Sequence, residues 1–226
     1  MKNFWRRLRF YGLGFGIGLI MVFFFFRNRG CTWMPENRVK NTLLGKVIVI
    51  SEDNQRIFEQ QHLSDSMVVS FLNDGSVNFG SSKKQGKTKV YKVTKEVNGK
   101  EVELWFSMPE GSFVAEASWP KGSIQKFGNT TKGYGKMVYF PHVNSFVYLK
   151  DNDELQKQMA ELGVKDEAHI QFLLKKGGLI DFSKSHLNAE PVPEQFVLLP
   201  RQKGDTLKAR TTWFKDHIEF YRFEQD

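Results

Sequence analysis

The sequence predicts an α+β protein: an N-terminal transmembrane helix, then two similar repeats, each a strand, two helices and a three- to four-stranded antiparallel meander. The run Phe10–Phe26 contains no charged residue. Several segments of the first half recur in the same order in the second half, and in each half helix-like apolar spacing gives way to strand-like alternation. We expect a basic tail at 1–9, a transmembrane helix at 10–26, a stalk at 27–42, a first repeat at 43–119, a linker at 120–138 and a second repeat at 139–226.

The charge of the chain lies mainly in its first 40 residues. The formal net charge is +8, with 40% apolar and 26% charged residues, as in a folded protein. Residues 1–40 hold eight lysines and arginines against Glu36 alone, so they carry +7 of that charge. Because a nucleic-acid-binding domain needs a basic face on its folded part, we expect no nucleic-acid partner.

The apolar run has the length and flanks of a short membrane span. Its 17 residues extend about 25 Å as a helix, near the short limit for a bilayer core. Because no small residues follow it as a cleavage site would require, we expect an uncleaved, single-pass signal anchor. Four basic residues among the first nine favour a cytoplasmic N-terminus. This predicts a bacterial inner-membrane protein with an external or periplasmic C-terminal part.

Four glycines lie within this run, and the cysteine of the chain follows it. Gly12 and Gly16, and likewise Gly14 and Gly18, have the spacing of a helix–helix contact. They favour contact with a second copy or with another membrane protein, although glycine is common in membrane helices. Cys31 is the only cysteine, so no intrachain disulfide is possible. It is either a free thiol or a cross-link to a second copy.

Three pairs of segments recur at an offset of roughly 100 residues. The pairs are Val47–Asn54 with Phe146–Asp153, Val68–Ser82 with His169–Ser185, and the turns Asn98–Lys100 with Lys203–Asp205. In both halves the second segment ends in serines. Because these pairs keep the same order, they indicate a duplication.

In the first repeat, Ser51 can cap a helix to about Gln61, and Ser64 or Asp65 a second helix that ends at Gly75. The residues at i, i+3 and i+4 on its apolar face are Val68, Phe71 and Leu72. The expected strands are Lys89–Val93 and Val102–Phe106, joined by a turn at Asn98–Gly99, and Phe113–Trp119.

In the second repeat, Asp151 or Asn152 can cap a helix that ends near Gly163, and Asp166 a second that ends at Gly177. The expected strands are Phe196–Leu199, Leu207–Trp213 and Ile218–Phe223.

The block Ile50–Phe79, together with the stalk Cys31–Arg38, resembles a family of membrane-anchored bacterial proteins of unknown function. Their domain shares its order of elements with BrnT-type and RelE-like toxin ribonucleases. The resemblance covers residues 1–119 and, more faintly, 142–224. It implies an α+β domain whose first helix would carry a His-Ala pair and arginines in the toxins. Here that stretch is Asp53–Arg56, and Asn152–Leu155 in the second repeat, so we expect no ribonuclease activity.

The remaining candidates for chemistry have simpler explanations. The five histidines lack metal-ligand spacing, and the recurrent serines at Ser81–Ser82 and Ser183–Ser185 suit turn hydrogen bonds better than a nucleophile. We expect no catalytic residue, metal or cofactor. One basic cluster is a solvated hairpin loop or a contact for anionic headgroups or an acidic partner. It consists of Lys83, Lys84, Lys87 and Lys89.

The sequence therefore favours a non-enzymatic protein held at a lipid bilayer, whose duplicated external part is a binding or scaffolding module. The alternative is an envelope enzyme, or a degenerate nuclease-like domain, with a site between the repeats.

Overall fold

A computed structural model describes residues 2–28, 34–187, 189, 193–201 and 205–224. In the first helix it describes the side chains of Arg7, Arg9 and residues 11–23. The chain forms two compact units, Met1–Val39 and Lys40–Asp226. The described residues contain six helices and eleven strands.

The first unit contains α1 (Lys2–Asn28) and the start of α2 (Pro35–Leu44). No helix in the described part of the chain is long and apolar enough to cross a membrane. The uncharged run Phe10–Phe26 extends about 25 Å as a helix, whereas a bilayer core is about 30 Å thick. Four of these residues are glycines, which add no apolar side chain. The predicted transmembrane helix and single-pass signal anchor are therefore wrong.

The four glycines proposed for a helix–helix contact all lie on α1, and each has open space where a Cβ would be. They are Gly12, Gly14, Gly16 and Gly18. Because the membrane span on which these glycines were placed is not supported, the spacing of Gly12 with Gly16 and of Gly14 with Gly18 no longer indicates a contact inside a bilayer. That these glycines contact another helix stays a prediction, as does the location of the rest of the chain.

The expected stalk is partly helical. Pro35 and Glu36 suit the first turn of α2, since proline needs no hydrogen bond there and a carboxylate favours the start of a helix. Cys31 lies outside the described residues.

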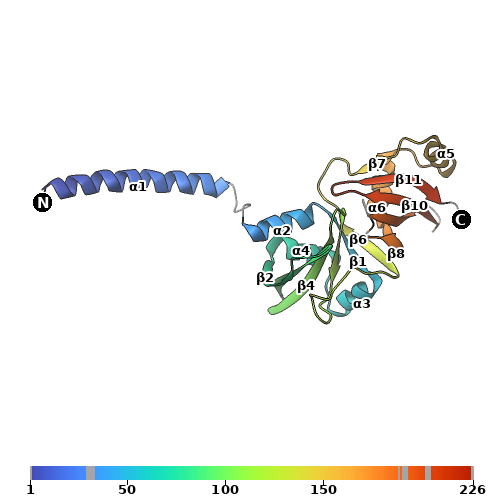
Figure 1. Cartoon of the computed structure of the whole chain (residues 1–226), viewed down its shortest axis with the longest axis horizontal. Helices are drawn as coiled ribbons and strands as arrows, with labels where there is room; N and C mark the ends of the chain where they lie inside the picture. Colours follow the sequence, from blue (N-terminus) through green and yellow to red (C-terminus); the bar gives the residue numbers. More distant parts are fainter. Residues whose placement is uncertain (1, 29–33, 188, 190–192, 202–204, 225–226) are drawn as a thin grey trace. The chain divides into compact units, whose positions relative to one another are not determined.

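The second unit is an α+β domain, as the sequence predicts, built on one mixed sheet (Figure 1). In its first half the elements are β1 (Val47–Ser51), α3 (Glu52–Gln60), α4 (Asp65–Asp74), β2 (Ser76–Lys83), β3 (Thr88–Val97), β4 (Lys100–Pro109) and β5 (Val114–Ser118). The linking strand is β6 (Tyr134–Tyr139). In the second half they are β7 (Val147–Leu149), α5 (Asp153–Leu162), α6 (Glu167–Gly177), β8 (Leu179–His186), β9 (Glu194–Pro200), β10 (Thr206–Trp213) and β11 (Ile218–Glu224).

The two halves have the same topology. The first has the strand order β2-β3-β4-β5-β1 and the second β8-β9-β10-β11-β7. In each half, the first strand along the chain pairs in parallel with the last, β1 with β5 and β7 with β11. A strand, two helices and a four-stranded meander are thus used twice.

The prediction of two separate repeats needs correction because a single sheet of eleven strands runs through both halves. The reason is β6, which lies in the expected linker 120–138. It pairs antiparallel with β1 on one side and with β8 on the other. Backbone hydrogen bonding across β6 joins the halves into one layer.

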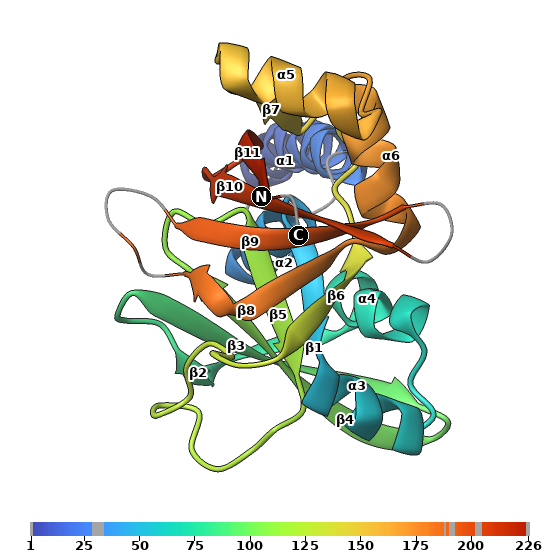
Figure 2. The ribbon, with the colours of Figure 1, turned by 90° about the vertical axis from the view of Figure 1, so that its right-hand side faces the viewer.

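The helices of the two halves cover opposite faces of this sheet (Figure 2). Because β6 is antiparallel to both neighbours, β8 runs in the direction of β1, whereas its counterpart β2 runs against β1. Equivalent strands of the halves therefore point in opposite directions while keeping the same lateral order. This arrangement reverses the two faces and places α3 and α4 on one side, α5 and α6 on the other.

Local signals explain most helix and turn boundaries. The side chains of Ser64, Asn152 and Asp166 accept hydrogen bonds from the first turns of α4, α5 and α6. Asn98 and Gly99 both have positive φ, 53° and 75°, as the tight turn between β3 and β4 requires. Ser51 precedes α3 but does not cap it with its side chain.

Candidate functional site

The recurrent serines hold equivalent bulges in the two halves. Ser82 Oγ donates to the Asn78 carbonyl (2.6 Å) and accepts from Lys92 N (3.0 Å). Ser185 Oγ donates to the Asp181 carbonyl (2.7 Å) and accepts from Phe196 N (3.0 Å). Both hydroxyls use their donor on the backbone, so they stabilise strands β2 and β8.

The basic cluster does not gather into one cationic site. Lys83 Nζ donates to the Phe127 carbonyl (2.8 Å), and Lys89 is half-buried in β3. Lys84 and Lys87 are exposed between β2 and β3. Contact of this cluster with headgroups or with an acidic partner stays a prediction.

His217 has structural neighbours. His217 Nδ1 lies 2.8 Å from Asp216 Oδ1, and its ring stacks on Phe214 with 4.6 Å between centroids. Among the residues that the structure describes, no group of three or more His, Cys, Asp or Glu side chains could hold a metal ion.

Burial and hydrogen bonds single out Glu116 on β5. This carboxylate is 4% exposed and accepts from Thr130 N (3.1 Å) and from the Thr130 hydroxyl. Burial raises the pKa of Glu116, while hydrogen bonds from Thr130 and Ser51 oppose that effect. Ser51, at the end of β1, is only 3% exposed. The hydrogen bonds between Thr130 and Glu116 attach the segment before β6 to the sheet. Because Glu116 and Ser51 are both buried, they offer little access to a substrate.

Lys46 is a second buried titratable group. Its Nζ donates to the Ser112 carbonyl, just before β5. Burial, with a smaller effect from Lys215, lowers the pKa of Lys46 to about 8. The ammonium thus satisfies a backbone acceptor inside the fold, which is a structural role.

Replacing Glu116 with glutamine is expected to change how stability depends on pH. A carboxyl with a raised pKa in the folded state binds its proton more tightly when folded, so stability falls as pH rises from the unfolded value of 4.5 toward the raised pKa. Glutamine keeps an acceptor for Thr130 without the charge. Urea midpoints between pH 4 and 8 should therefore shift in favour of Glu116→Gln as pH rises. The exposed control Glu110→Gln should follow the native profile, and parallel profiles for Glu116→Gln would contradict the assignment.

The edge of the sheet at β7 offers backbone groups to a partner. β7 is the last strand in the sheet order, and it pairs with β11 alone among the described strands. Ile218 N donates to the Phe146 carbonyl, and Lys150 N donates to the Phe220 carbonyl. Because alternate residues of a strand direct their backbone groups to opposite sides, those of Val147 and Leu149 face the open side.

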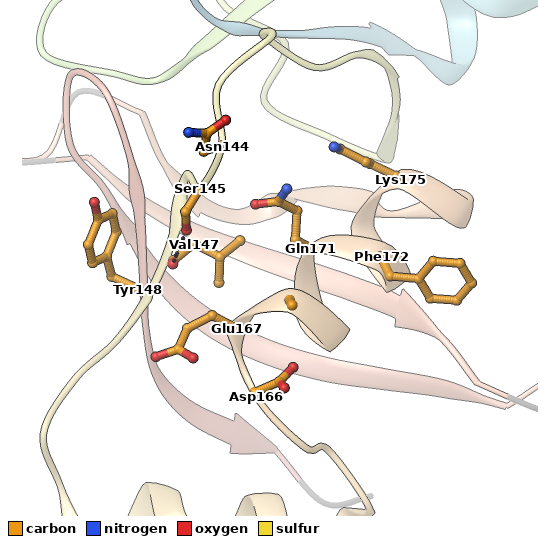
Figure 3. A pocket seen from close by; sticks show the side chains of 10 residues that line it. Asn144, Ser145, Val147, Tyr148, Asp166, Glu167, Gln171, Phe172 and Lys175 are labelled. Carbon is orange, nitrogen blue, oxygen red and sulfur yellow. Dashed lines mark hydrogen bonds between the residues drawn. The ribbon is translucent and has the colours of Figure 1, made fainter.

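A groove of about 540 Å³ lies between this part of the chain and α6 (Figure 3). Its strand side includes Val147 and Tyr148, and Tyr148 is 51% exposed. On the helix side, Gln171 extends toward the segment at Ser145 and its Oε1 accepts from Phe146 N (3.3 Å), whereas Phe172 points away (Figure 3). An exposed aromatic side chain and backbone groups that pair with no neighbouring described strand thus occur together.

The ends of α6 give the groove an uneven charge. Asp166 and Glu167 lie where α6 begins, and Lys175 lies near its end. Asp166 accepts from His169 N at 2.7 Å, and Lys175 Nζ lies 5.7 Å from the centroid of the Phe146 ring. Glu167 is exposed and forms no ion pair with any side chain that the structure describes.

The equivalent edge in the first half is already occupied. β1 is the counterpart of β7, and its corresponding side pairs with β6 in antiparallel register, with Ile50 opposite Lys136 and Val49 opposite Met137. Lys136 Nζ also lies 2.5 Å from Asp65 Oδ2, on the first residue of α4. The protein therefore contains an example of a strand added to this type of edge.

The sequence did not predict the strand on the edge of β1, because most of β6 falls in the expected linker 120–138. The segment Gly135–Tyr139 contains only a weak strand signal, since a glycine and a lysine precede Met137. The open edge itself has no sequence motif.

No protein-family model matches the chain, and no curated protein or solved structure matches it either. The resemblance to anchored proteins with a toxin-like domain therefore stays a prediction.

Proposed function

We propose that this protein is a non-enzymatic binding module that takes up an extended segment of a partner protein along the open edge of β7. The observation that carries the proposal is the pairing of β6 with β1, the counterpart of β7. The two halves share one topology, so the same mode of binding suits both edges.

The backbone geometry supports an added strand. Val147 and Leu149 face the open side, and Val147 O accepts a hydrogen bond only from Ser145 Oγ (3.2 Å) among the described partners. A carbonyl oxygen has two lone pairs, so this contact leaves room for a second donor. Each added backbone hydrogen bond contributes about 0.5–1.5 kcal/mol, so a short strand would bind weakly, with a Kd on the order of 0.1–1 mM.

A synthetic peptide with the sequence of residues 133–140 tests this mode of binding, because it contains β6. In the protein, Met137 N donates to the Gly178 carbonyl on the β8 side, so Lys136 directs its backbone toward β1. N-methylation of the lysine amide should therefore weaken binding to the whole chain at least about tenfold, since it removes a hydrogen bond and adds bulk.

N-methylation at the methionine is the matched control, because that amide would face solvent in the complex. Fluorescence anisotropy of a labelled peptide measures both affinities. Equal affinities for the two methylated peptides, or no binding of the unmodified peptide at millimolar protein, would overturn strand addition at β7.

A further inference from the structure

The occupied edge in the first half also shows how an added strand is selected by charge. Lys136 of β6 pairs with Asp65 at 2.5 Å, and these two residues are 71 positions apart in the sequence. The carboxylate belongs to the first residue of α4, directly after the N-cap Ser64. A helix start beside the edge thus supplies the acid for a basic residue on the strand.

The second half has an acid at the matching place. Asp166 is the N-cap of α6 and accepts from the amide three residues ahead, as Ser64 does for α4. The residue directly after this cap is Glu167, so it is the counterpart of Asp65. Glu167 lines the groove beside β7 and has no described ionic partner.

We infer that the β7 edge selects an extended, basic segment of a partner protein, with a lysine or arginine opposite Leu149 that pairs with Glu167. The inference rests on the proposed function and adds to it the chemistry of the partner. Leu149 corresponds to Ile50, the residue that faces Lys136 in the register of β1 and β6. The segment would run antiparallel to β7.

The same register describes the next position of the segment. Met137 lies opposite Val49, whose counterpart in the second half is Tyr148. This ring is 51% exposed and lies 4.9 Å, centroid to centroid, from the ring of His217. An apolar residue beside the basic one would cover the exposed part of Tyr148. The preferred partner is therefore a segment that alternates basic and apolar residues.

Two peptides and two protein variants test the charge selection. The first peptide is the 133–140 sequence, and the second replaces its lysine, the equivalent of Lys136, with glutamate. The native chain should bind the lysine peptide roughly three- to tenfold more tightly, since an exposed pair is replaced by a repulsion of similar size. Glu167→Lys should reverse that preference. The difference should shrink in high salt, because both charges are exposed.

Glu154→Lys is the matched control: it makes the same charge change in the first turn of α5 and should keep the native preference. If the two peptides bind equally to all three proteins while methylation of the lysine amide still weakens binding, Glu167 selection is overturned and strand addition stands. If neither peptide binds, strand addition fails and the selection fails with it. Self-association of the free chain that the lysine peptide competes away would assign the edge to a second copy and overturn a foreign partner.

Discussion

Replacing Trp213 with alanine is expected to lower the free energy of unfolding of the second unit by about 3–5 kcal/mol. Trp213 ends β10 and is 0% exposed. Its ring lies 6.2 Å from the ring of Phe113, and Phe113 lies 5.9 Å from Phe146, between centroids. Because Phe113 precedes β5 while Trp213 and Phe146 belong to the second half, this cluster packs the halves together.

The indole also takes part in a buried chain of hydrogen bonds. Trp213 Nε1 donates to Thr211 Oγ1 (2.7 Å), and that hydroxyl donates to the Gln195 carbonyl (2.8 Å). Alanine would leave a cavity and remove the donor to Thr211 at the same time. Because β10 lies between β9 and β11 in the sheet, the site has little freedom to collapse.

Urea unfolding followed by far-UV circular dichroism measures this loss without relying on tryptophan fluorescence. Phe172→Ala, at a side chain that is 59% exposed, is the control and should change stability by about 0.5 kcal/mol or less. Trp213→Phe should fall between the two. A loss below about 1 kcal/mol for Trp213→Ala would contradict a packed junction between the halves.

Much of each half could be predicted from local sequence. The Asn98–Gly99 turn and the caps at Ser64 and Asp166 act over three or four residues, so their chemistry is visible in a short window. The buried face Val68, Phe71 and Leu72 of α4 follows from the helical period.

The union of the halves could not be predicted in this way. It depends on which strands β6 joins, and β6 pairs with β1 and β8, which lie far from it on both sides in the sequence. The apolar run near the N-terminus gave a further wrong prediction, because an uncharged run predicts a span only where the helix is apolar enough over its whole length, and no helix in the described part of the chain is.

The candidate site lay beyond sequence reasoning for a related reason. An open edge is defined by the absence of a neighbouring strand, and this depends on the order of the whole sheet. The pair Lys136–Asp65 depends on the same order. Only the duplication, which is visible in the sequence, allows the occupied edge to be compared with the open one.

Gly135 is expected to be essential for β6, the strand that joins the two halves. A Cβ added there would lie 2.5 Å from Val49 Cγ1 and would also overlap the Phe182 ring. Val49 is 0% and Phe182 2% exposed, so neither can move into solvent. Gly135→Val should therefore lower the free energy of unfolding by about 3 kcal/mol, at the upper end of the usual cost of overpacking.

Gly128→Val is the control for this change, because nothing lies within 4 Å of an added Cβ at Gly128. It should change stability by about 0.5 kcal/mol or less. Urea midpoints at constant slope measure both variants. A double-mutant cycle with Phe182→Ala locates the clash: if it occurs at that ring, the double variant should be at least about 1 kcal/mol more stable than the sum of the single changes predicts. Additive effects would place the clash at Val49 of β1 instead. A loss below about 1 kcal/mol for Gly135→Val would mean that β6 is loosely held, and the pairing of β1 with β6 would then be a poor guide to what binds β7.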